Sequence, residues 1–578
     1  MDNNKSLLAI ALLCATGVTQ AGEKEELLKL RNTTTNLIKQ LVKQGVLSDK
    51  LAEDMIKQAE TDAEQQVAVA KAAEANGNEP SDPDEVRVAY VPDFVKDEIR
   101  QQVRSELREE VVGDVMQKAK QEKWGVPDAL PEWINRITIS GDMRLRSQHE
   151  YMASDNIANA YFDPMAINDL GGVTNAGPNA FLNTTNDRQR FRERFRLGID
   201  AKITDNFKAG VRLATGNQRD PVSTNQTLGN TGSRYDFAVD RAFLQYDAID
   251  DDKFNWLTLT GGRIANPWFT GGGGFRDGAI TGAVSELVWD SDLSFEGFAG
   301  TVRHQLGGAE GLTTKSDKSR SVFATVGAFP LQESSLSSDK WLFGGQLGLD
   351  WGFANQDKLK VAAAYYDFVN VQAKPNTTLT ETCDINSPAN NASVPQFQQF
   401  GNTLATICNE GTINNPAKLP GRIGLASDYN IVNLSATYDT AVFAPYHLKI
   451  SGDFAKNVGF NQAEVSRLHD PAHAETNPVT PETIGWKLRA DFGWLKDDLP
   501  GKWSIFAAYK YLERDAVFDA FTDSDFHLGG TNAKGWILGG NYGLFKHTWL
   551  TARWLTANVI TGPAYGVDVL QLDLNTRF

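Results

Sequence analysis

From residue 137 to the end of the chain, apolar and polar residues alternate with a period of two. The segment 137–146 (ITISGDMRLR) shows this well, because its odd positions are mostly apolar and its even positions are polar. Successive side chains of a β-strand point to opposite faces, so the alternation predicts a strand with one apolar and one polar face. Similar segments of about 9–12 residues recur, and a tilted membrane-spanning strand needs about this length. They begin near 137, 192, 206, 237, 255, 294, 320, 341, 358, 429, 446, 481, 502, 532, 547 and 567.

The connections between these segments favour one closed barrel over a chain of small β domains. Short connections alternate with long ones such as 148–190 and 370–428, which is typical of bacterial outer-membrane barrels. Counting 279–289 as a strand gives seventeen and places those two longest loops on opposite sides. Taking 264–293 as one long loop gives sixteen and restores the alternation, and eighteen stays open as the neighbouring even number. We therefore expect an all-β transmembrane antiparallel β-barrel of about sixteen strands.

The composition excludes several other classes of protein. The chain has 578 residues, a formal net charge of −16 and three cysteines. It lacks the runs of about 20 apolar residues that membrane-spanning helices need. Few cysteines argue against a disulfide scaffold, and the negative net charge argues against a nucleic-acid binder, which usually has a basic surface. A β-barrel remains possible, because its alternating strands average to a water-soluble composition.

The first 130 residues follow a different pattern. Residues 1–21 have the features of a secretory signal peptide, with Lys5 near the start, a short apolar stretch and a Thr-Gln-Ala cleavage site. Residues 22–125 are rich in Lys, Glu, Gln and Ala, carry apolar residues at helical spacing, and contain a linker near 76–92. This segment is expected to be α-helical and coiled-coil-like, either a solvated stalk or an oligomerising bundle. The barrel is expected over 131–578.

Two cysteines remain after the signal peptide is removed. Cys383 and Cys408 are 25 residues apart in one polar stretch. An exported protein meets an oxidising compartment, where such a pair is expected to form a disulfide that closes a surface loop. Two free thiols are the alternative, and a metal site is not expected because no histidine lies between them.

The last strand carries a local signal of its own. In LQLDLNTRF (570–578), the leucines and Phe578 share one face, while Asp573, Asn575 and Arg577 share the other. A terminal phenylalanine after an alternating strand resembles the signal that the outer-membrane barrel-assembly machinery reads. Phe578 is therefore the candidate assembly signal.

Several longer motifs resemble the bacterial "putative porin" family. They are LVKQGVLSDKLAEDM (41–55), the run 86–110, the run QEKWGVPDALPEWINRITISGDMRLRSQHEY (121–151), and LVWDSDLSFEG (287–297). The resemblance covers nearly all of the mature chain. It implies a helical segment in the periplasm followed by an outer-membrane channel.

Arginines gather on the polar faces of the first four predicted strands. In RFRERFR (190–196) every even position is arginine, and the odd positions carry two phenylalanines and one glutamate. Arginine facing lipid at mid-membrane depth costs about 2–4 kcal/mol, so these side chains are expected to line the pore. The alternative is that some lie above the membrane and bind lipopolysaccharide phosphates. The predicted basic strip comprises Arg144, Arg146, Arg190, Arg192, Arg194, Arg196, Arg212 and Arg241.

The loop 264–293 is the candidate constriction. It follows the fifth strand, where sixteen-stranded porins fold a loop into the pore. Acidic residues of this loop, facing a basic wall, would create a transverse field that slows apolar solutes and passes small ions and polar solutes. The candidate residues are Arg276, Asp277, Glu286, Asp290 and Asp292.

The sequence thus predicts a passive outer-membrane porin for small hydrophilic solutes or ions, with an anion bias. A structural tether is the alternative, in which periplasmic helices contact peptidoglycan or a partner protein. The chain has no nucleophile elbow, HExxH motif or zinc pair, so neither an enzyme, a cofactor nor a metal is expected. The expected partners are outer-membrane lipid, lipopolysaccharide, the assembly machinery, and further copies of this chain, a trimer being usual for sixteen-stranded porins.

Overall fold

The computed structural model describes residues 134–270, 285–306, 320–353, 355, 357–376, 382–383, 388–412, 415–496 and 498–578. The chain divides into two compact units, Met1–Val112 and Gly113–Phe578. The predicted signal peptide (1–21) and helical segment (22–125) lie outside the described residues, as do Arg276 and Asp277 of the candidate constriction.

Sixteen long antiparallel strands form a closed barrel, which confirms the predicted fold class and strand number. Each strand pairs with its neighbours along the chain, and the last strand pairs with the first. The strands are β1 (Ile137–Met152), β2 (Arg188–Lys202), β3 (Phe207–Ala214), β5 (Ala238–Ile249), β6 (Asn255–Ala265), β7 (Ser294–Gln305), β8 (Arg320–Gln332), β9 (Lys340–Gly352), β10 (Lys358–Val369), β13 (Tyr429–Thr440), β14 (His447–Asn457), β15 (Ile484–Gly493), β16 (Trp503–Leu512), β17 (Ala533–Phe545), β18 (Thr548–Val559) and β19 (Gly566–Arg577). The predicted starts lie within four residues of the observed ones.

The first two strands are longer than the 9–12 residues that we expected. β1 has 16 residues and β2 has 15. They pair continuously from Ile137 opposite Ala201 to Glu150 opposite Arg188, so the ladder continues into what the sequence pattern assigned to a loop. Continued pairing satisfies the backbone N–H and C=O groups of these residues.

Main-chain hydrogen bonds at Phe578 complete the seam between β1 and β19. The amide of Phe578 donates to the carbonyl of Gly141 at 3.0 Å, and the amide of Gly141 donates back to Phe578 at 3.1 Å. A closed sheet leaves no unpaired edge, which is the condition for a β-structure to span a membrane.

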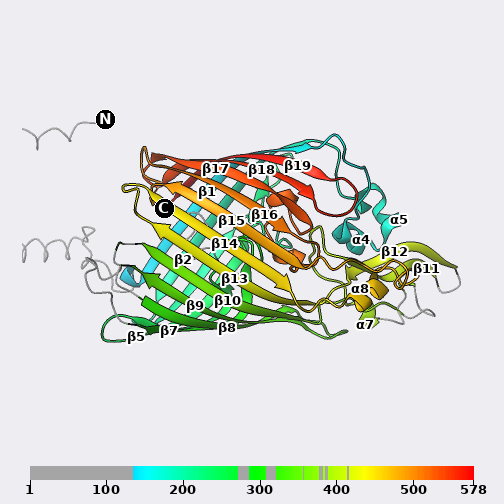
Figure 1. Cartoon of the computed structure of the whole chain (residues 1–578), viewed down its shortest axis with the longest axis horizontal. Helices are drawn as coiled ribbons and strands as arrows, with labels where there is room; N and C mark the ends of the chain where they lie inside the picture. Colours follow the sequence, from blue (N-terminus) through cyan, green and yellow to red (C-terminus); the bar gives the residue numbers. More distant parts are fainter. Residues whose placement is uncertain are drawn as a thin grey trace, which may run out of the picture. The chain divides into compact units, whose positions relative to one another are not determined.

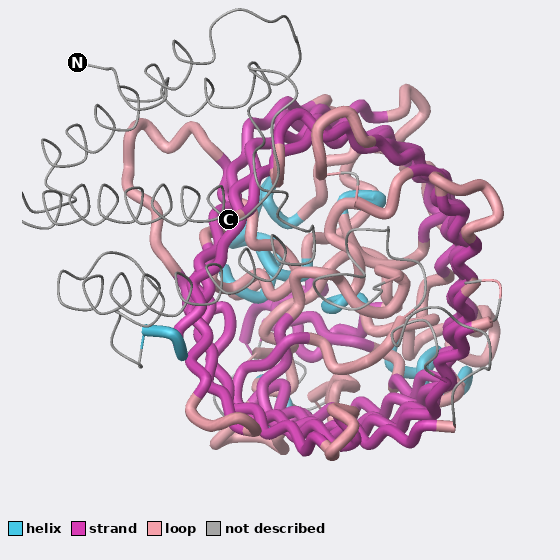
Figure 2. Tube along the Cα trace, turned by 90° about the vertical axis from the view of Figure 1, so that its left-hand side faces the viewer, coloured by secondary structure: helices cyan, strands magenta, loops and turns pink. Residues whose placement is uncertain are grey.

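Most connections at one end of the barrel are short turns, and most at the other end are longer loops (Figure 1). The connection 306–319 between β7 and β8 is a long exception at the short-turn end. We number the connections at the long-loop end in chain order. Those named in the text are loop 1 (153–187), loop 2 (215–237), loop 3 (266–293), loop 5 (370–428), loop 6 (458–483) and loop 7 (513–532). Figure 2 shows the ring of strands with loops and short helices within its outline, and Figure 1 shows that several of these helices lie beyond the strand ends.

Smaller elements lie at the start of the barrel and within these loops. Loop 5 forms a separate hairpin, β11 (Leu404–Thr412) with β12 (Asn415–Leu425), which the sequence did not predict. Cys383 and Cys408 form a disulfide beside this hairpin. None of the helices in the described part of the chain has the length and apolarity needed to cross a membrane. The remaining elements are η2 (Ile134–Arg136), α4 (Pro164–Leu170), α5 (Val173–Ala176), η3 (Gly177–Ala180), β4 (Gln226–Thr227), α7 (Pro388–Asn391), α8 (Gln462–His469), η5 (Asp519–Phe521) and η6 (Phe526–Leu528).

The outward face of the barrel is apolar. Phe298 is 73% exposed and Leu347 is 69% exposed, which a water-soluble sheet would avoid over a large area. Trp536, Tyr542 and Trp554 are also exposed on this face. A lipid environment accounts for this surface, because it removes the cost of exposing apolar side chains.

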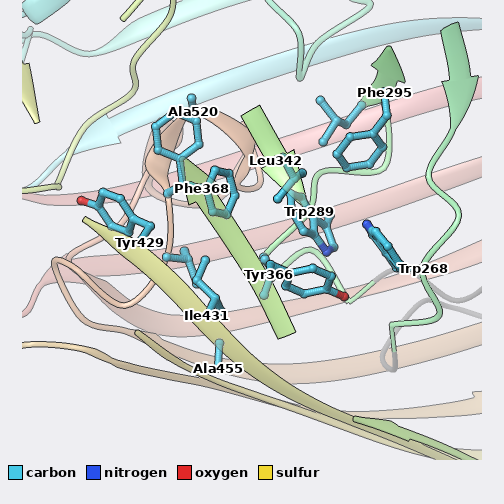
Figure 3. Close-up of a cluster of buried hydrophobic side chains, with 14 of the residues drawn as sticks. Trp268, Trp289, Phe295, Leu342, Tyr366, Phe368, Tyr429, Ile431, Ala455 and Ala520 are labelled. Carbon is cyan, nitrogen blue, oxygen red and sulfur yellow. The ribbon is translucent and has the colours of Figure 1, made fainter. Parts of the chain in front are cut away.

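An apolar core fills one side of the barrel interior. Trp289 of loop 3 is fully buried, and its ring centroid lies 4.9 Å from that of Tyr366 on β10 and 5.2 Å from that of Phe295 on β7 (Figure 3). Phe518 and Ala520 of loop 7 belong to the same cluster. Loops 3 and 7 therefore pack against the strands from β7 to β14, and this packing holds their polar residues toward the opposite wall.

Candidate functional site

A cavity of about 590 Å³ lies in the barrel interior on the side away from the apolar core. Its walls are inward side chains of β1, β2, β3, β5 and β15 to β19, together with residues of loops 2, 3 and 7. Eight arginine and eight acidic side chains border it among the described residues. The arginines are Arg144, Arg194, Arg196, Arg212, Arg241, Arg489, Arg553 and Arg577; the acids are Asp142, Asp200, Glu286, Asp290, Asp292, Asp523, Asp525 and Asp573.

The register of the first strands places arginines directly opposite one another. Arg144 on β1 faces Arg194 on β2, Arg146 faces Arg192, and Arg212 on β3 faces Arg241 on β5. Like charges in such positions are destabilising, so each pair needs compensating groups. Carboxylates from neighbouring strands and from the loops supply part of this compensation.

A β-bulge turns Arg241 toward the cavity. Arg212 pairs with Arg241, but the next residue, Leu213, pairs with Val239, which leaves Asp240 as an extra residue. Both Asp240 and Arg241 then point inward, where Asp240 binds Arg212. A bulge is a common means of re-aiming a side chain within a sheet.

The eight arginines of the predicted strip fall into two groups. Arg144, Arg194, Arg196, Arg212 and Arg241 border the cavity. The other three lie on the same inward faces but do not border it. Arg146 is 2% exposed and donates to Asp573 at 2.8 Å and to Asp525 at 2.9 Å. Arg190 binds Glu150, and Arg192 donates to the hydroxyl of Ser223 at 3.4 Å.

Loop 3 crosses the interior and reaches the basic wall through Asp292. This carboxylate lies 3.1 Å from Arg196 and 3.5 Å from Arg194, and it accepts a hydrogen bond from Thr224 of loop 2 at 3.1 Å. Burial opposes ionisation of Asp292, but the positive charges of Arg194 and Arg196 outweigh burial and lower its pKa. Asp292 is therefore a charged group on the surface of the cavity.

Asp290 lies in a different environment in the same loop. Its carboxylate accepts hydrogen bonds from the amides of Asp292 at 2.7 Å and Ser524 at 3.0 Å. Burial, reinforced by the nearby Asp292, raises the pKa of Asp290 well above its usual range. Two carboxyl groups of one loop thus have opposite shifts, because only Asp292 contacts arginines.

The far side of loop 3 is held by two lysines. Lys487 on β15 donates to the carbonyl of Ser285 at 2.5 Å, and Lys510 on β16 donates to the carbonyl of Glu286 at 3.0 Å. The Glu286 carboxylate lies 3.9 Å from Lys487. Loop 3 is therefore attached to both walls, and Glu286 borders the cavity between them.

Loops 2 and 7 also contribute residues to the cavity, and the sequence pattern predicted neither contribution. Asn225 of loop 2 accepts a hydrogen bond from Arg144. In loop 7, Asp525 binds Arg146 and Arg553, and the positive charges of these arginines outweigh burial and hold its pKa well below the usual range. The segment FDAFTDSDF (518–526) did carry a signal, because aromatic residues at this density in a polar loop need a buried partner.

Within the described ranges, no group of three or more His, Cys, Asp or Glu side chains is arranged to hold a metal ion. The chemistry available in the cavity is instead hydrogen bonding and charge. Guanidinium groups of the wall and carboxylates of the loops contact one another, and both kinds of group border the cavity.

A family model and several solved structures match the chain. The family model described as "Putative porin" matches residues 31–578. No curated protein matches the chain. Among solved structures, Pseudomonas putida OprB is 11% identical, with 77% of this chain and 96% of that chain covered and a TM-score of 0.40. The outer membrane channel DcaP of Acinetobacter baumannii is also 11% identical, with 76% and 97% covered and a TM-score of 0.37.

Proposed function

Because the chain belongs to the family described as "Putative porin" and is an outer-membrane channel, we propose that small hydrophilic solutes and ions cross passively through the cavity beside the basic wall. Both the family and the barrel indicate a channel rather than an enzyme. The apolar core closes the other side of the interior, so the charged side is the path that remains for a solute.

The observation that carries this proposal is the pairing of opposite charges around the cavity. Arg194 and Arg196 extend from β2 and contact Asp292 of loop 3, while Asp525 of loop 7 contacts Arg146 and Arg553. Fixed opposite charges along a wall order the water beside them, which slows apolar solutes and favours small polar ones. Such an arrangement suits the passage of a solute, because a moving solute can form hydrogen bonds with one charged group after another.

The expected ion selectivity is a weak preference for anions. The arginine and acidic side chains that border the cavity are equal in number, so no large excess of charge exists. Asp290 is one of the acids, and burial raises its pKa, which works against its negative charge. The net charge of the side chains that border the cavity is therefore expected to be weakly positive.

We also propose a membrane setting for the parts of the chain outside the cavity. Phe578, at the β1–β19 seam, serves as the signal for the barrel-assembly machinery, and the helical segment 22–125 lies in the periplasm. The apolar outer wall contacts lipid, lipopolysaccharide and further copies of the chain in a homo-oligomer. The exposed apolar side chains of that wall support these contacts.

Planar-bilayer recording tests the proposal. Purified protein is expected to give discrete current steps in KCl, with a reversal potential that indicates a weak anion preference. Replacing Arg192, Arg194 and Arg196 with alanine should lower the anion/cation permeability ratio. The absence of current at any voltage would refute the channel, and an unchanged reversal potential in the triple variant would refute the role of the arginines.

A further inference from the structure

The three cross-strand arginine pairs share an unexpected regularity. In each pair, one guanidinium binds a carboxylate. Its partner, among the described residues, binds only a neutral side-chain oxygen. Arg194, Arg146 and Arg212 are the members bound to carboxylates. The members with neutral partners are Arg144, Arg192 and Arg241.

The neutral contacts leave hydrogen-bonding capacity unused. Arg144 donates to the amide oxygen of Asn225, Arg192 to the hydroxyl of Ser223 at 3.4 Å, and Arg241 to the hydroxyl of Ser294 at 3.3 Å. The Nε atoms of Arg144 and Arg192 are buried without a partner in the described part of the chain. Each guanidinium offers five N–H donors, so several have no protein acceptor.

An enclosed guanidinium without a counter-ion is costly, and a bound anion removes that cost. Two of the three arginines that bind no carboxylate directly, Arg144 and Arg241, border the same cavity. Their planar groups match the geometry of a carboxylate or a phosphate, which can accept two parallel hydrogen bonds. Chloride is a single atom and has no such pair of oxygen acceptors.

The geometry points to binding of a small oxyanion, a carboxylate or a phosphate, in this cavity against the guanidinium of Arg144 or of Arg241. This inference rests on the proposed function, because it assumes that the cavity is the solute path. The channel then retains oxyanions on their way through, so that their passage saturates and competes with the passage of chloride.

The experiment measures chloride current through the wild-type channel while succinate or inorganic phosphate is added. Either oxyanion is expected to reduce the chloride current along a saturating curve. The double variant Arg144→Gln/Arg241→Gln should raise the half-blocking concentration by about tenfold or more, as expected when hydrogen bonds to a charged group are lost. Block by succinate alone indicates a carboxylate site, and block by phosphate alone indicates a phosphate site.

A matched control separates a discrete site from diffuse charge. Arg489→Gln/Arg577→Gln also removes two arginines that border the cavity, but these bind carboxylates, Asp491 and Asp498. The control should retain the wild-type half-blocking concentration within about twofold, since it leaves Arg144 and Arg241 in place.

Equal shifts of the half-blocking concentration in both double variants would contradict a discrete oxyanion site. If no oxyanion blocks a wild-type channel that conducts chloride, the site fails while the proposed function stands. A wild type that conducts nothing overturns both. If a variant fails to fold, the block of the wild-type chloride current by oxyanions still tests whether a site exists.

Discussion

Asp525 of loop 7 accepts hydrogen bonds from Arg146 of β1 at 2.9 and 3.1 Å, although 379 residues separate them in the chain. Arg553 on β18 donates to the same carboxylate at 2.6 Å, and Gln571 on β19 donates at 2.9 Å. One loop carboxylate thus binds three neighbouring strands. This contact fixes loop 7 beside the cavity and compensates two buried guanidinium groups.

Asp525→Asn is expected to destabilise the barrel. Loss of the carboxylate leaves Arg553 and Arg146 undercompensated. The cost is about 3 kcal/mol, the low end for breaking a buried ion pair, because Arg146 keeps Asp573. Urea unfolding in detergent measures this change. Asp169→Asn breaks an exposed pair with Arg219 and should cost less than about 1 kcal/mol. Equal losses in the two variants would contradict the structural role of Asp525.

Asp292→Asn should increase the preference for anions. A unit charge about 7 Å from a passing ion in water changes the energies of an anion and of a cation by about 0.6 kcal/mol each, in opposite directions, so the anion/cation permeability ratio should rise about eightfold. Reversal potentials in a KCl gradient measure the ratio. Glu296→Gln removes the same charge from the outer surface, where Glu296 binds Arg263, and should leave the ratio unchanged. A similar ratio in wild type and Asp292→Asn would count against loop 3 as a selectivity element.

Gly262→Ala should lower the stability of the folded barrel by about 1–3 kcal/mol, the cost of a strained backbone residue. Gly262 has a φ of +111°, and a Cβ atom there would lie 2.3 Å from the carbonyl oxygen of Ala242. The temperature at which the barrel unfolds in SDS gels reports the change. Gly345→Ala is the control, because a Cβ at that position meets no atom within 4 Å. The unfolding temperature should fall clearly in Gly262→Ala and almost not at all in Gly345→Ala.

Acidification should loosen loop 7 through His527. Burial lowers the pKa of His527 to about 4, and its imidazole bonds to the carbonyl of Tyr565 at 3.1 Å. The unfolded loop takes up a proton below its ordinary pKa of about 6.5, whereas the folded loop resists until about 4. The stability from this group is therefore complete above pH 6.5 and falls by up to ~3 kcal/mol as the pH drops to 4.

Hydrogen-exchange protection of the amides in loop 7 at pH 7 and pH 5 tests this dependence. The wild type should lose protection at the lower pH after correction for intrinsic exchange. His527→Gln should show a smaller change, since it removes the titrating group. A variant that loses as much protection as the wild type would assign the effect to another residue.

The period-two alternation was sufficient to predict the barrel, because each strand must present an apolar face to lipid and a polar face to the interior. It was not sufficient for the hairpin in loop 5. The sequence of β12 contains two prolines, which argue against a strand in the middle of a sheet. β11 is the one strand that pairs with β12 among the described residues. The other edge of β12 carries a single bridge, from Leu425 to Gln372, beyond both prolines.

The candidate site was harder to predict than the wall around it. Strand alternation places Arg144 and Arg194 on inward faces, but no local pattern indicates which arginine meets a loop carboxylate. Asp525 and Asn225 reach the cavity because apolar residues of loops 7 and 2 pack in the core, and such contacts join distant parts of the chain. The position of Arg241 depends on a bulge, which shifts the alternation by one residue.

The most direct test of the account is whether the cavity lies on the ion path. Thr551 on β18 borders the cavity, and its neighbour Leu550 faces outward and is 45% exposed. Cysteine is introduced at each position, and a charged, membrane-impermeant thiol reagent is added during recording. The account predicts that the reagent reduces the current of Thr551→Cys and leaves that of Leu550→Cys unchanged. An unaltered current in a fully modified Thr551→Cys channel would contradict it.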